Sequence, residues 1–342
     1  MNDTASTPLT APTKFVFVTG HTFGRRAVEG MVTSSAFLAG HLQWAGAVQL
    51  GASRQDRTVG YGGLEELAGW HDVEVRQTVD GSLLSLADWL REVSPRFILV
   101  VGWSRIVAPQ VLDLPRSLWG AVEEPRNTPR FGAVGMHPSP LPEGRGRAPI
   151  PWTLIKGLRH TALTTFFLED TVDSGAVIAQ RHVDVRDTET ASSLFLRFAD
   201  AHYHAGRHIA DLMAERRVVG HPQDPTLATT WPRRTPADSR IDPTAPRRSV
   251  AAFVRALSAP YPRAFLALGA RHLRVDTCRE LPADSPAPPG AVLGADGRWL
   301  HVAVGDGALA LRVVDEDLAG LVLAVEPDDA GGPVGSGLAS HG

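Results

Sequence analysis

The sequence of 342 residues contains one cysteine, Cys278. A single cysteine excludes an intramolecular disulfide and a zinc site built from cysteines, and it fits a reducing compartment. We therefore expect a cytoplasmic protein. Apolar runs approaching the ~20 residues needed to span a bilayer are also missing, so no membrane association is expected. Residues 1–13 lack the basic and apolar regions of a signal peptide.

The sequence has no excess of positive charge either. Its formal net charge is -3, with 34 Lys and Arg against 37 Asp and Glu. Such a balance gives no broad attraction to a phosphate backbone, so no nucleic-acid partner is expected. The turn at residues 20–24 lacks a GxGxxG pattern and a P-loop lysine. We therefore predict neither a dinucleotide site nor an ATP site there.

Hydrophobic residues make up 43% of the chain, which at this length is enough for two domains with their own cores. Within residues 14–218, apolar runs of strand character alternate with stretches of helical spacing. This alternation predicts an α/β fold with a doubly wound, mostly parallel sheet. The expected strands are 14–19, 42–50, 71–76, 97–102, 133–137, 161–168 and 176–185, and the expected helices are 25–39, 82–93, 148–158 and 188–217, the last with Thr188 as N-cap.

The remainder of the chain has a different character. Residues 219–248 are rich in Pro, Arg, Asp and Thr without apolar periodicity, which predicts a linker pinned onto the first domain. Short strands separated by turns then predict a small, β-barrel-like domain at 249–325. Residues 1–13 and 326–342 are expected to be disordered tails. The polar stretch 118–131 is interpreted as a surface flap.

The residues most suited to chemistry lie between 132 and 185. A short buried strand is predicted to end at His137, and a loop rich in proline and glycine follows it. Asp173 lies in an acidic turn between two further predicted strands. An imidazole beside a carboxylate can stabilise an oxyanion and carry a proton, because the carboxylate orients the ring and favours its charged form.

Three short motifs in this stretch resemble a known family in both order and spacing. They are residues 136–142 (MHPSPLP), 145–146 (RG) and 172–175 (VDSG), and together they resemble the formyltransferases that use 10-formyltetrahydrofolate. Residues 101–106 resemble the family's pterin-holding loop, and 255–265 resemble the start of its C-terminal domain. The amino-acid sequence of residues 144–158 is most similar to the sequences of the branch that formylates amino sugars.

The resemblance implies a Rossmann-like formyltransferase core with 10-formyltetrahydrofolate as cosubstrate. It also implies an N-formyltransferase that acts on a small-molecule amine, for which a nucleotide-linked amino sugar is the best candidate. A homodimer is implied as well, because members of the family commonly form dimers. The alternatives are a hydroxyornithine-like amine, methionyl-tRNA, or a catalytically silent folate- or nucleotide-binding protein. The acidic balance and the lack of a Lys-rich insert near the first strand's loops argue against tRNA.

By resemblance, His137 is the oxyanion stabiliser and proton carrier, and Asp173 is its partner and base, acting through water. The family's catalytic Asn stands two residues before the His, where this chain has Gly135. Losing an oxyanion donor typically costs about 10²–10³ in rate. A backbone N–H, or the hydroxyl of Ser139 or Ser104, would have to replace it, or the rate is low. We favour a replacement donor.

The remaining site residues are likewise implied by the resemblance. Arg145 and Arg147, with Ser139, are expected to hold acceptor phosphates or the folate glutamate, although Arg145 anchoring its own loop through a buried salt bridge is an equal alternative. A metal site is not predicted, since His204 and His208 lack a third ligand. The expected folate-binding residues are Trp103, Ser104, Arg105, Ile106, Leu141, Glu169, Val172 and Gly175.

Overall fold

The computed structural model describes residues 11–51, 58–78, 80–120, 131–282 and 286–314. The chain divides into two compact units, and the division falls between Asp238 and Ser239, inside the segment predicted as a linker. The short stretch 259–261 belongs to the first unit. Both predicted tails, apart from residues 11–13, and most of the predicted flap at 118–131 lie outside the described residues.

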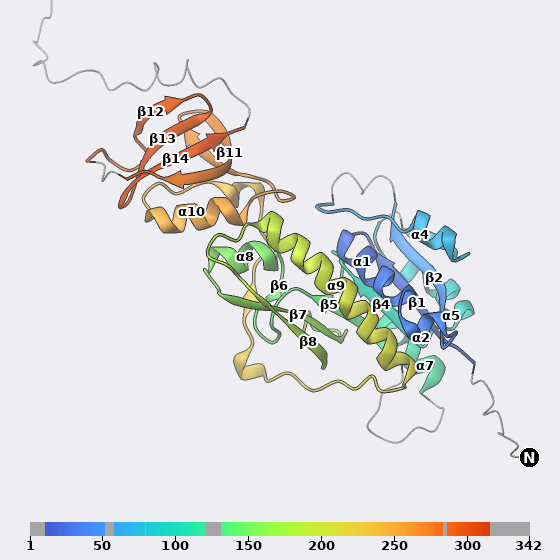
Figure 1. Ribbon diagram of the computed structural model, residues 1–342. Helices are drawn as coiled ribbons and strands as arrows, with labels where there is room; N and C mark the ends of the chain where they lie inside the picture. Colours follow the sequence, from blue (N-terminus) through green and yellow to red (C-terminus); the bar gives the residue numbers. More distant parts are fainter. Residues whose placement is uncertain (1–10, 52–57, 79, 121–130, 283–285, 315–342) are drawn as a thin grey trace, which may run out of the picture. The chain divides into compact units, whose positions relative to one another are not determined.

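The first unit is built on a seven-stranded sheet with the order β3-β2-β1-β4-β5-β7-β8 (Figure 1). The first five strands along the chain pair in parallel, and the last two are antiparallel. This confirms the predicted α/β fold with a mostly parallel sheet. The strands are β1 (Thr13–Thr19), β2 (Leu42–Leu50), β3 (Val75–Thr78), β4 (Phe97–Val101), β5 (Gly132–His137), β7 (His160–Phe167) and β8 (Val177–Asp184).

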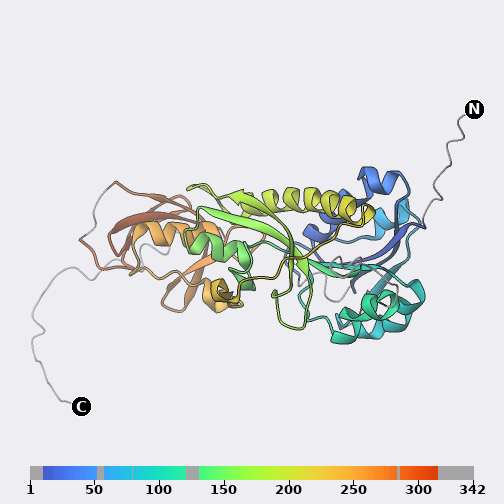
Figure 2. The same cartoon turned by 90° about the horizontal axis from the view of Figure 1, so that it is seen from below.

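Helices cover both faces of this sheet. Figure 2 shows α9 (Ala191–Ala214), drawn in yellow, and the teal helices α6 (Pro109–Leu112) and α7 (Leu114–Trp119) on opposite sides. Because β4 is sandwiched between the two layers, all five of its residues are buried. The other described helices of the unit are α1 (Thr22–Val32), α2 (Ser35–Leu38), α4 (Glu65–Trp70), η1 (Leu84–Leu86), α5 (Ala87–Val93), α8 (Pro149–Ile155) and η2 (Pro225–Leu227), and η3 (Pro236–Ser239) lies at its boundary.

Helices α1 and α9 cross at very close range. A Cβ atom added to Gly30 would lie 2.0 Å from the carbonyl oxygen of Tyr203, and one added to Gly206 would lie 1.9 Å from that of Ala27. Only glycine allows two backbones to approach so closely. These two positions therefore set how α9 lies on the unit.

Several predicted element boundaries are wrong, and three of them have a local physical reason. The helix expected at 25–39 is two helices, because Ser34 has an extended backbone and caps α2 through its hydroxyl. The strand expected at 71–76 starts only at Val75, since Asp72 adopts a left-handed turn with φ +53°. Helix α9 is capped by Thr190 rather than Thr188, because Thr190 and Ser193 form a reciprocal capping box.

The second unit contains α10 (Arg247–Ala256) and a five-stranded antiparallel sheet with the order β10-β11-β14-β13-β12. The buried residues of the helix and of its C-cap, Val250, Val254 and Leu257, share one core with buried strand residues such as Leu273 and Leu300. The unit therefore has its own core. Its strands are β10 (Ala264–Leu268), β11 (Arg271–Glu280), β12 (Val292–Asp296), β13 (Trp299–Val304) and β14 (Gly307–Val313).

Residues 221–231, within the predicted linker, are hydrogen-bonded onto the first unit. His221 exchanges two backbone hydrogen bonds of 2.8 Å with Val177. The two-residue strand β9 (Thr230–Trp231) pairs in parallel with β6 (Arg145–Gly146). This segment is thus an ordered part of the first unit. In the part of the chain that the structure describes, no helix has both the length and the apolar character needed to span a bilayer.

Candidate active site

His137 is the last residue of β5 and stands at the carboxyl edge of the parallel strands, where ligands bind in sheets of this kind. Its Nε2 lies 2.9 Å from the carbonyl oxygen of Gly144. A carbonyl oxygen can only accept, so Nε2 carries a hydrogen and donates it. In the neutral ring, Nδ1 therefore holds the free lone pair.

Asp173 reaches His137 from the turn between β7 and β8. Its Oδ2 lies 3.7 Å from Nδ1 of His137, and only 10% of the histidine side chain and 15% of the aspartate side chain are exposed. This separation is too long for a direct hydrogen bond but lies within ion-pair distance of a protonated imidazole. The same Oδ2 accepts a 2.8 Å hydrogen bond from the backbone N–H of Gly146. The structure thus brings together the two residues that were expected to form the catalytic pair.

The loop that receives the His137 ring is shaped by glycine and tryptophan. Gly144 has φ +74°, and a Cβ atom there would lie 2.7 Å from the indole of Trp231. Gly146 has φ +106° and would meet the carbonyl oxygen of Trp231 at 2.4 Å. Side chains at either position would push the loop away from residues 221–231. The carbonyl that His137 contacts is fixed in this way.

The space beside Gly135 is occupied by other side chains. Gly135 is buried in β5 on the same face as His137, because side chains two residues apart along a strand point to the same side. A Cβ atom at Gly135 would lie 2.7 Å from Cδ2 of Leu168 and 3.2 Å from the ring of Phe166. Leu168 therefore fills the room that an asparagine side chain would need.

Ser139 is not arranged as a ready replacement for that amide. Ser139 is completely buried, and its hydroxyl donates to the carbonyl of Glu143 at 2.9 Å, so its hydrogen is already engaged. Ser104 is exposed, and its carbonyl accepts a 2.8 Å hydrogen bond from Nη2 of Arg147. Arg147 thereby joins the loop after β4 to the loop after β5.

Arg145 is anchored to an amide. Its Nε and Nη2 donate to Oε1 of Gln223 at 3.2 and 2.6 Å. Among the described residues, no carboxylate lies within salt-bridge distance of Arg145 or Arg147. The alternative in which Arg145 anchors its own loop is therefore supported, through Gln223 rather than through a buried salt bridge.

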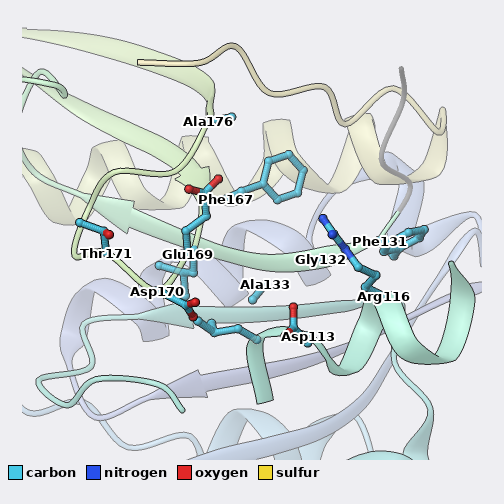
Figure 3. A pocket seen from close by; sticks show the side chains of 12 residues that line it. Asp113, Arg116, Phe131, Gly132, Ala133, Phe167, Glu169, Asp170, Thr171 and Ala176 are labelled. Atoms are coloured by element: carbon cyan, nitrogen blue, oxygen red, sulfur yellow. The ribbon is translucent and has the colours of Figure 1, made fainter. Parts of the chain in front are cut away.

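A cavity of about 460 Å³ opens near the start of β5, and His137 and Asp173 are not among the residues that line it (Figure 3). Ala133 lines it and lies on the same face of β5 as Gly135 and His137, and Leu168 lines it from the end of β7. Figure 3 shows Arg116 and Glu169 coming from different sides, one from α7 and one from the turn after β7. The lining residues are Leu112, Asp113, Arg116, Phe131, Gly132, Ala133, Phe167, Leu168, Glu169, Asp170, Thr171 and Ala176.

Only Glu169 of the expected folate-binding residues lines this cavity. Trp103 packs with Leu168 against the core layer under α5 and α6, so it lies on the same side of the sheet. Ile106 and Val172 are 79% and 51% exposed, and Leu141 is buried. Gly175 has a structural role as well, since a Cβ atom there would lie 1.9 Å from the carbonyl oxygen of Phe167.

Two further histidines lie in the interior of the unit. Nδ1 of His21 accepts a 3.1 Å hydrogen bond from the N–H of Phe23 and caps α1, and burial lowers the pKa of His21 to about 4. His202 is completely buried, donates from Nδ1 to the carbonyl of Phe198 at 2.6 Å and stacks on Phe23. Burial lowers the pKa of His202 to about 3. Both rings are therefore neutral at physiological pH, which no local sequence pattern indicated.

His204 forms an exposed contact of 3.6 Å with Asp200. Across the described ranges, no group of three or more His, Cys, Asp or Glu side chains is arranged to hold a metal ion. The functional groups that His137 and Asp173 bring together are an imidazole and a carboxylate 3.7 Å apart. When Nδ1 of His137 is protonated it can donate to an oxyanion, and the Asp173 carboxylate can accept a proton, which suits acyl transfer to an amine.

Comparison with known proteins matches two family models and one related enzyme. The model of the formyl transferase family matches residues 121–206, and the model of the formyl transferase C-terminal domain matches residues 233–317. A methionyl-tRNA formyltransferase from Pelobacter propionicus is 29% identical over 249 residues, which is 73% of this chain and 73% of that protein.

Two solved structures share the fold. WlaRD, a sugar 3N-formyltransferase crystallised with dTDP and 5-N-formyl-THF, superposes with a TM-score of 0.62 at 10% identity, over 89% of this chain and 98% of that one. An N-formyltransferase from Helicobacter canadensis, in complex with folinic acid and dTDP-3-aminofucose, gives a TM-score of 0.61 at 12% identity, over 88% of this chain and 100% of that one. With its two matched domains and its shared fold, this chain belongs to the formyltransferase family.

Proposed function

We propose that the protein transfers a formyl group from 10-formyltetrahydrofolate to the amine of a small molecule, and that this acceptor is a nucleotide-linked amino sugar. The observation that carries the proposal is that Ala133, Gly135 and His137 follow one another on a single face of β5. Ala133 lines the cavity at the start of the strand, and His137 at its end lies 3.7 Å from Asp173. A donor held in the cavity would present its reacting end to that pair.

The cavity suits the pterin end of a folate. Its volume of about 460 Å³ lies in the range of small-molecule sites. Leu112, Ala133 and Leu168 offer apolar contact to a flat heterocycle. The carboxylates of Glu169 and Asp170 can accept from the amino and ring N–H groups of a pterin, and hydrogen bonds to charged acceptors are among the stronger ones.

In the reaction, the lone pair of the neutral acceptor amine attacks the formyl carbon and forms a new C–N bond. The electron pair of the formyl C=O moves to oxygen, and the imidazolium form of His137 stabilises that oxyanion by donating from Nδ1. Asp173 takes the proton that the attacking nitrogen loses. Collapse of the intermediate breaks the bond to N10 of the folate, which receives a proton from His137 and leaves as tetrahydrofolate.

Support for a nucleotide sugar comes from residues at the open side of the site. Arg147 is exposed beside the loop after β4, and its guanidinium has further N–H groups besides the one that contacts Ser104. A guanidinium suits the oxygens of a diphosphate. The Helicobacter canadensis protein, which shares the fold, binds dTDP-3-aminofucose. Methionyl-tRNA is the second candidate acceptor, favoured by the 29% identity to a methionyl-tRNA formyltransferase.

The experiment is a panel of acceptors incubated with the purified protein and 10-formyltetrahydrofolate. Tetrahydrofolate release and the mass of the N-formyl product are measured for dTDP-, UDP- and GDP-linked amino sugars, for hydroxyornithine and for methionyl-tRNA. We expect turnover with at least one nucleotide sugar and none with the corresponding sugar lacking its amine. Formylation of methionyl-tRNA alone would replace the proposal, and folate binding without release for any acceptor would make the protein a silent binder.

A further inference from the structure

The turn that carries Asp173 is held by the side chain of Gln223, which lies outside the sequence motifs. Nε2 of Gln223 donates to the carbonyl oxygens of Asp173 at 2.9 Å and of Gly175 at 2.8 Å. Oε1 of Gln223 accepts from Nε and Nη2 of Arg145 at 3.2 and 2.6 Å. A single amide group therefore joins the acidic turn to the loop that follows His137.

Asp173 needs such support because of its backbone. Its φ is +54°, a left-handed conformation that is unfavourable for most residues other than glycine. Conformations of this kind persist only where the surroundings enforce them. The described contacts that enforce it are the two hydrogen bonds from Gln223 to the turn and the 2.8 Å hydrogen bond from Gly146 N–H to the carboxylate.

Gln223 can act as a support because its own segment is fixed on both sides. His221, two residues before it, exchanges two backbone hydrogen bonds with Val177. Thr229, six residues after it, accepts from the backbone N–H of Arg145 at 2.9 Å, and its Oγ1 accepts from the N–H of Gly144 at 2.9 Å. The carbonyl of Gly144 is in turn the acceptor for His137. Residues 221–231 thus hold both halves of the pair.

We propose that Gln223 is a positioning residue for formyl transfer, acting through Asp173 by keeping its carboxylate 3.7 Å from the imidazole of His137. This inference rests on the proposed function, because the rate of transfer is one of its readouts. Misplacing a catalytic group by about 1 Å can cost about 10²-fold in rate. The effect of losing Gln223 should therefore appear in kcat and leave substrate binding nearly unchanged.

Two variants separate the two halves of the amide. Gln223→Ala removes all of its contacts. Gln223→Glu keeps the length of the side chain and an acceptor for Arg145 but cannot donate to the carbonyls of the turn. We expect both variants to lower kcat about 10- to 100-fold, with KM for 10-formyltetrahydrofolate and for the acceptor within about threefold of wild type. The control is Thr226→Val, whose hydroxyl donates only to Asp224, at 2.7 Å, and it should retain the wild-type kcat.

A second readout does not depend on turnover. The N–H of Gly146 is protected by its hydrogen bond to Asp173, so its hydrogen exchange reports where the carboxylate is. We expect this amide to exchange at least about tenfold faster in both variants, with the amides of β4 unchanged. Unchanged exchange at Gly146 would overturn the proposal. A Gln223→Glu variant with wild-type kcat would also overturn it, since the contact to Arg145 would then suffice. A wild-type protein that formylates no acceptor would refute the proposed function, and the exchange data would still decide the role of Gln223.

Discussion

An asparagine at position 135 would collide with Leu168, and the collision can be relieved by shortening that leucine. The added Cβ would lie 2.7 Å from Cδ2 of Leu168 and 3.2 Å from the ring of Phe166. Cδ2 is the end of a flexible side chain that can turn away, so Gly135→Asn alone should cost about 1–2 kcal/mol of unfolding free energy, in the lower part of the range for overpacked cores. Leu168→Ala removes a half-buried side chain and should cost about 2 kcal/mol by itself.

The double variant distinguishes a shared space from two independent effects. If Leu168 occupies the room of the missing amide, the double variant should lose at least about 1 kcal/mol less than the sum of the two single variants. Urea unfolding of all four proteins measures this coupling. An additive result would show that Leu168 does not fill that space.

Turnover of the same four proteins tests the chemistry. Because the hydroxyl hydrogen of Ser139 is engaged by the carbonyl of Glu143, the added amide should act as a new oxyanion donor. We expect tetrahydrofolate release by the double variant to exceed that of Leu168→Ala by about tenfold or more, which is part of the effect of one such donor. Equal rates would mean that a native donor such as Ser104 already stands in for the amide.

Three further predictions concern stability and reactivity. Burial lowers the pKa of His202 in the folded protein from 6.5 to about 3. The stability that the neutral ring contributes is therefore complete above pH 6.5 and is lost as the pH falls toward 3. By pH 4.5 the free energy of unfolding should have fallen by about 2–3 kcal/mol. His202→Phe should abolish that part of the acid sensitivity, which urea unfolding of the variant and of wild type at pH 7.5 and 4.5 measures. An equal pH dependence in the variant and in wild type would contradict the burial argument. Gly206→Ala should destabilise the protein by about 3 kcal/mol or more, because the new Cβ would lie 1.9 Å from the carbonyl oxygen of Ala27; a melting temperature equal to that of wild type would contradict it. Burial raises the pKa of Cys278 from 9.0 to about 11, so alkylation at pH 8 should be about 100-fold slower than for a free cysteine, and a mass-spectrometric rate close to that of glutathione would count against it.

The positions of His137 and Asp173 could be predicted because both lie in strongly local patterns. The apolar run before His137 is long enough to define a strand. The turn with Asp173 follows β7, which runs antiparallel to β5, so its approach to His137 depends on how that turn folds back and was implied only by the family resemblance. The break at Ser34 was missed because it interrupts an otherwise helical pattern by capping, which depends on one hydroxyl.

The cavity and Gln223 could not be predicted from the sequence, and for different reasons. Leu112 and Arg116 line the cavity from α6 and α7, whose residues have no motif and meet β5 only through the tertiary fold. Gln223 lies in a polar segment without periodicity, and its contacts to Arg145 and Asp173 join residues far apart along the chain. The space at Gly135 is decided by Leu168, which no rule of local spacing connects to it.

The central claim is that His137 and Asp173 together carry out formyl transfer. The most direct measurement is single-turnover release of tetrahydrofolate from 10-formyltetrahydrofolate, with an accepted amine at saturation, for wild type, Asp173→Asn and His137→Asn. General acid–base groups contribute about 10²–10⁴-fold, so each variant should release tetrahydrofolate slower by about that factor while binding folate as tightly as wild type. Release at the wild-type rate by either variant would contradict the account.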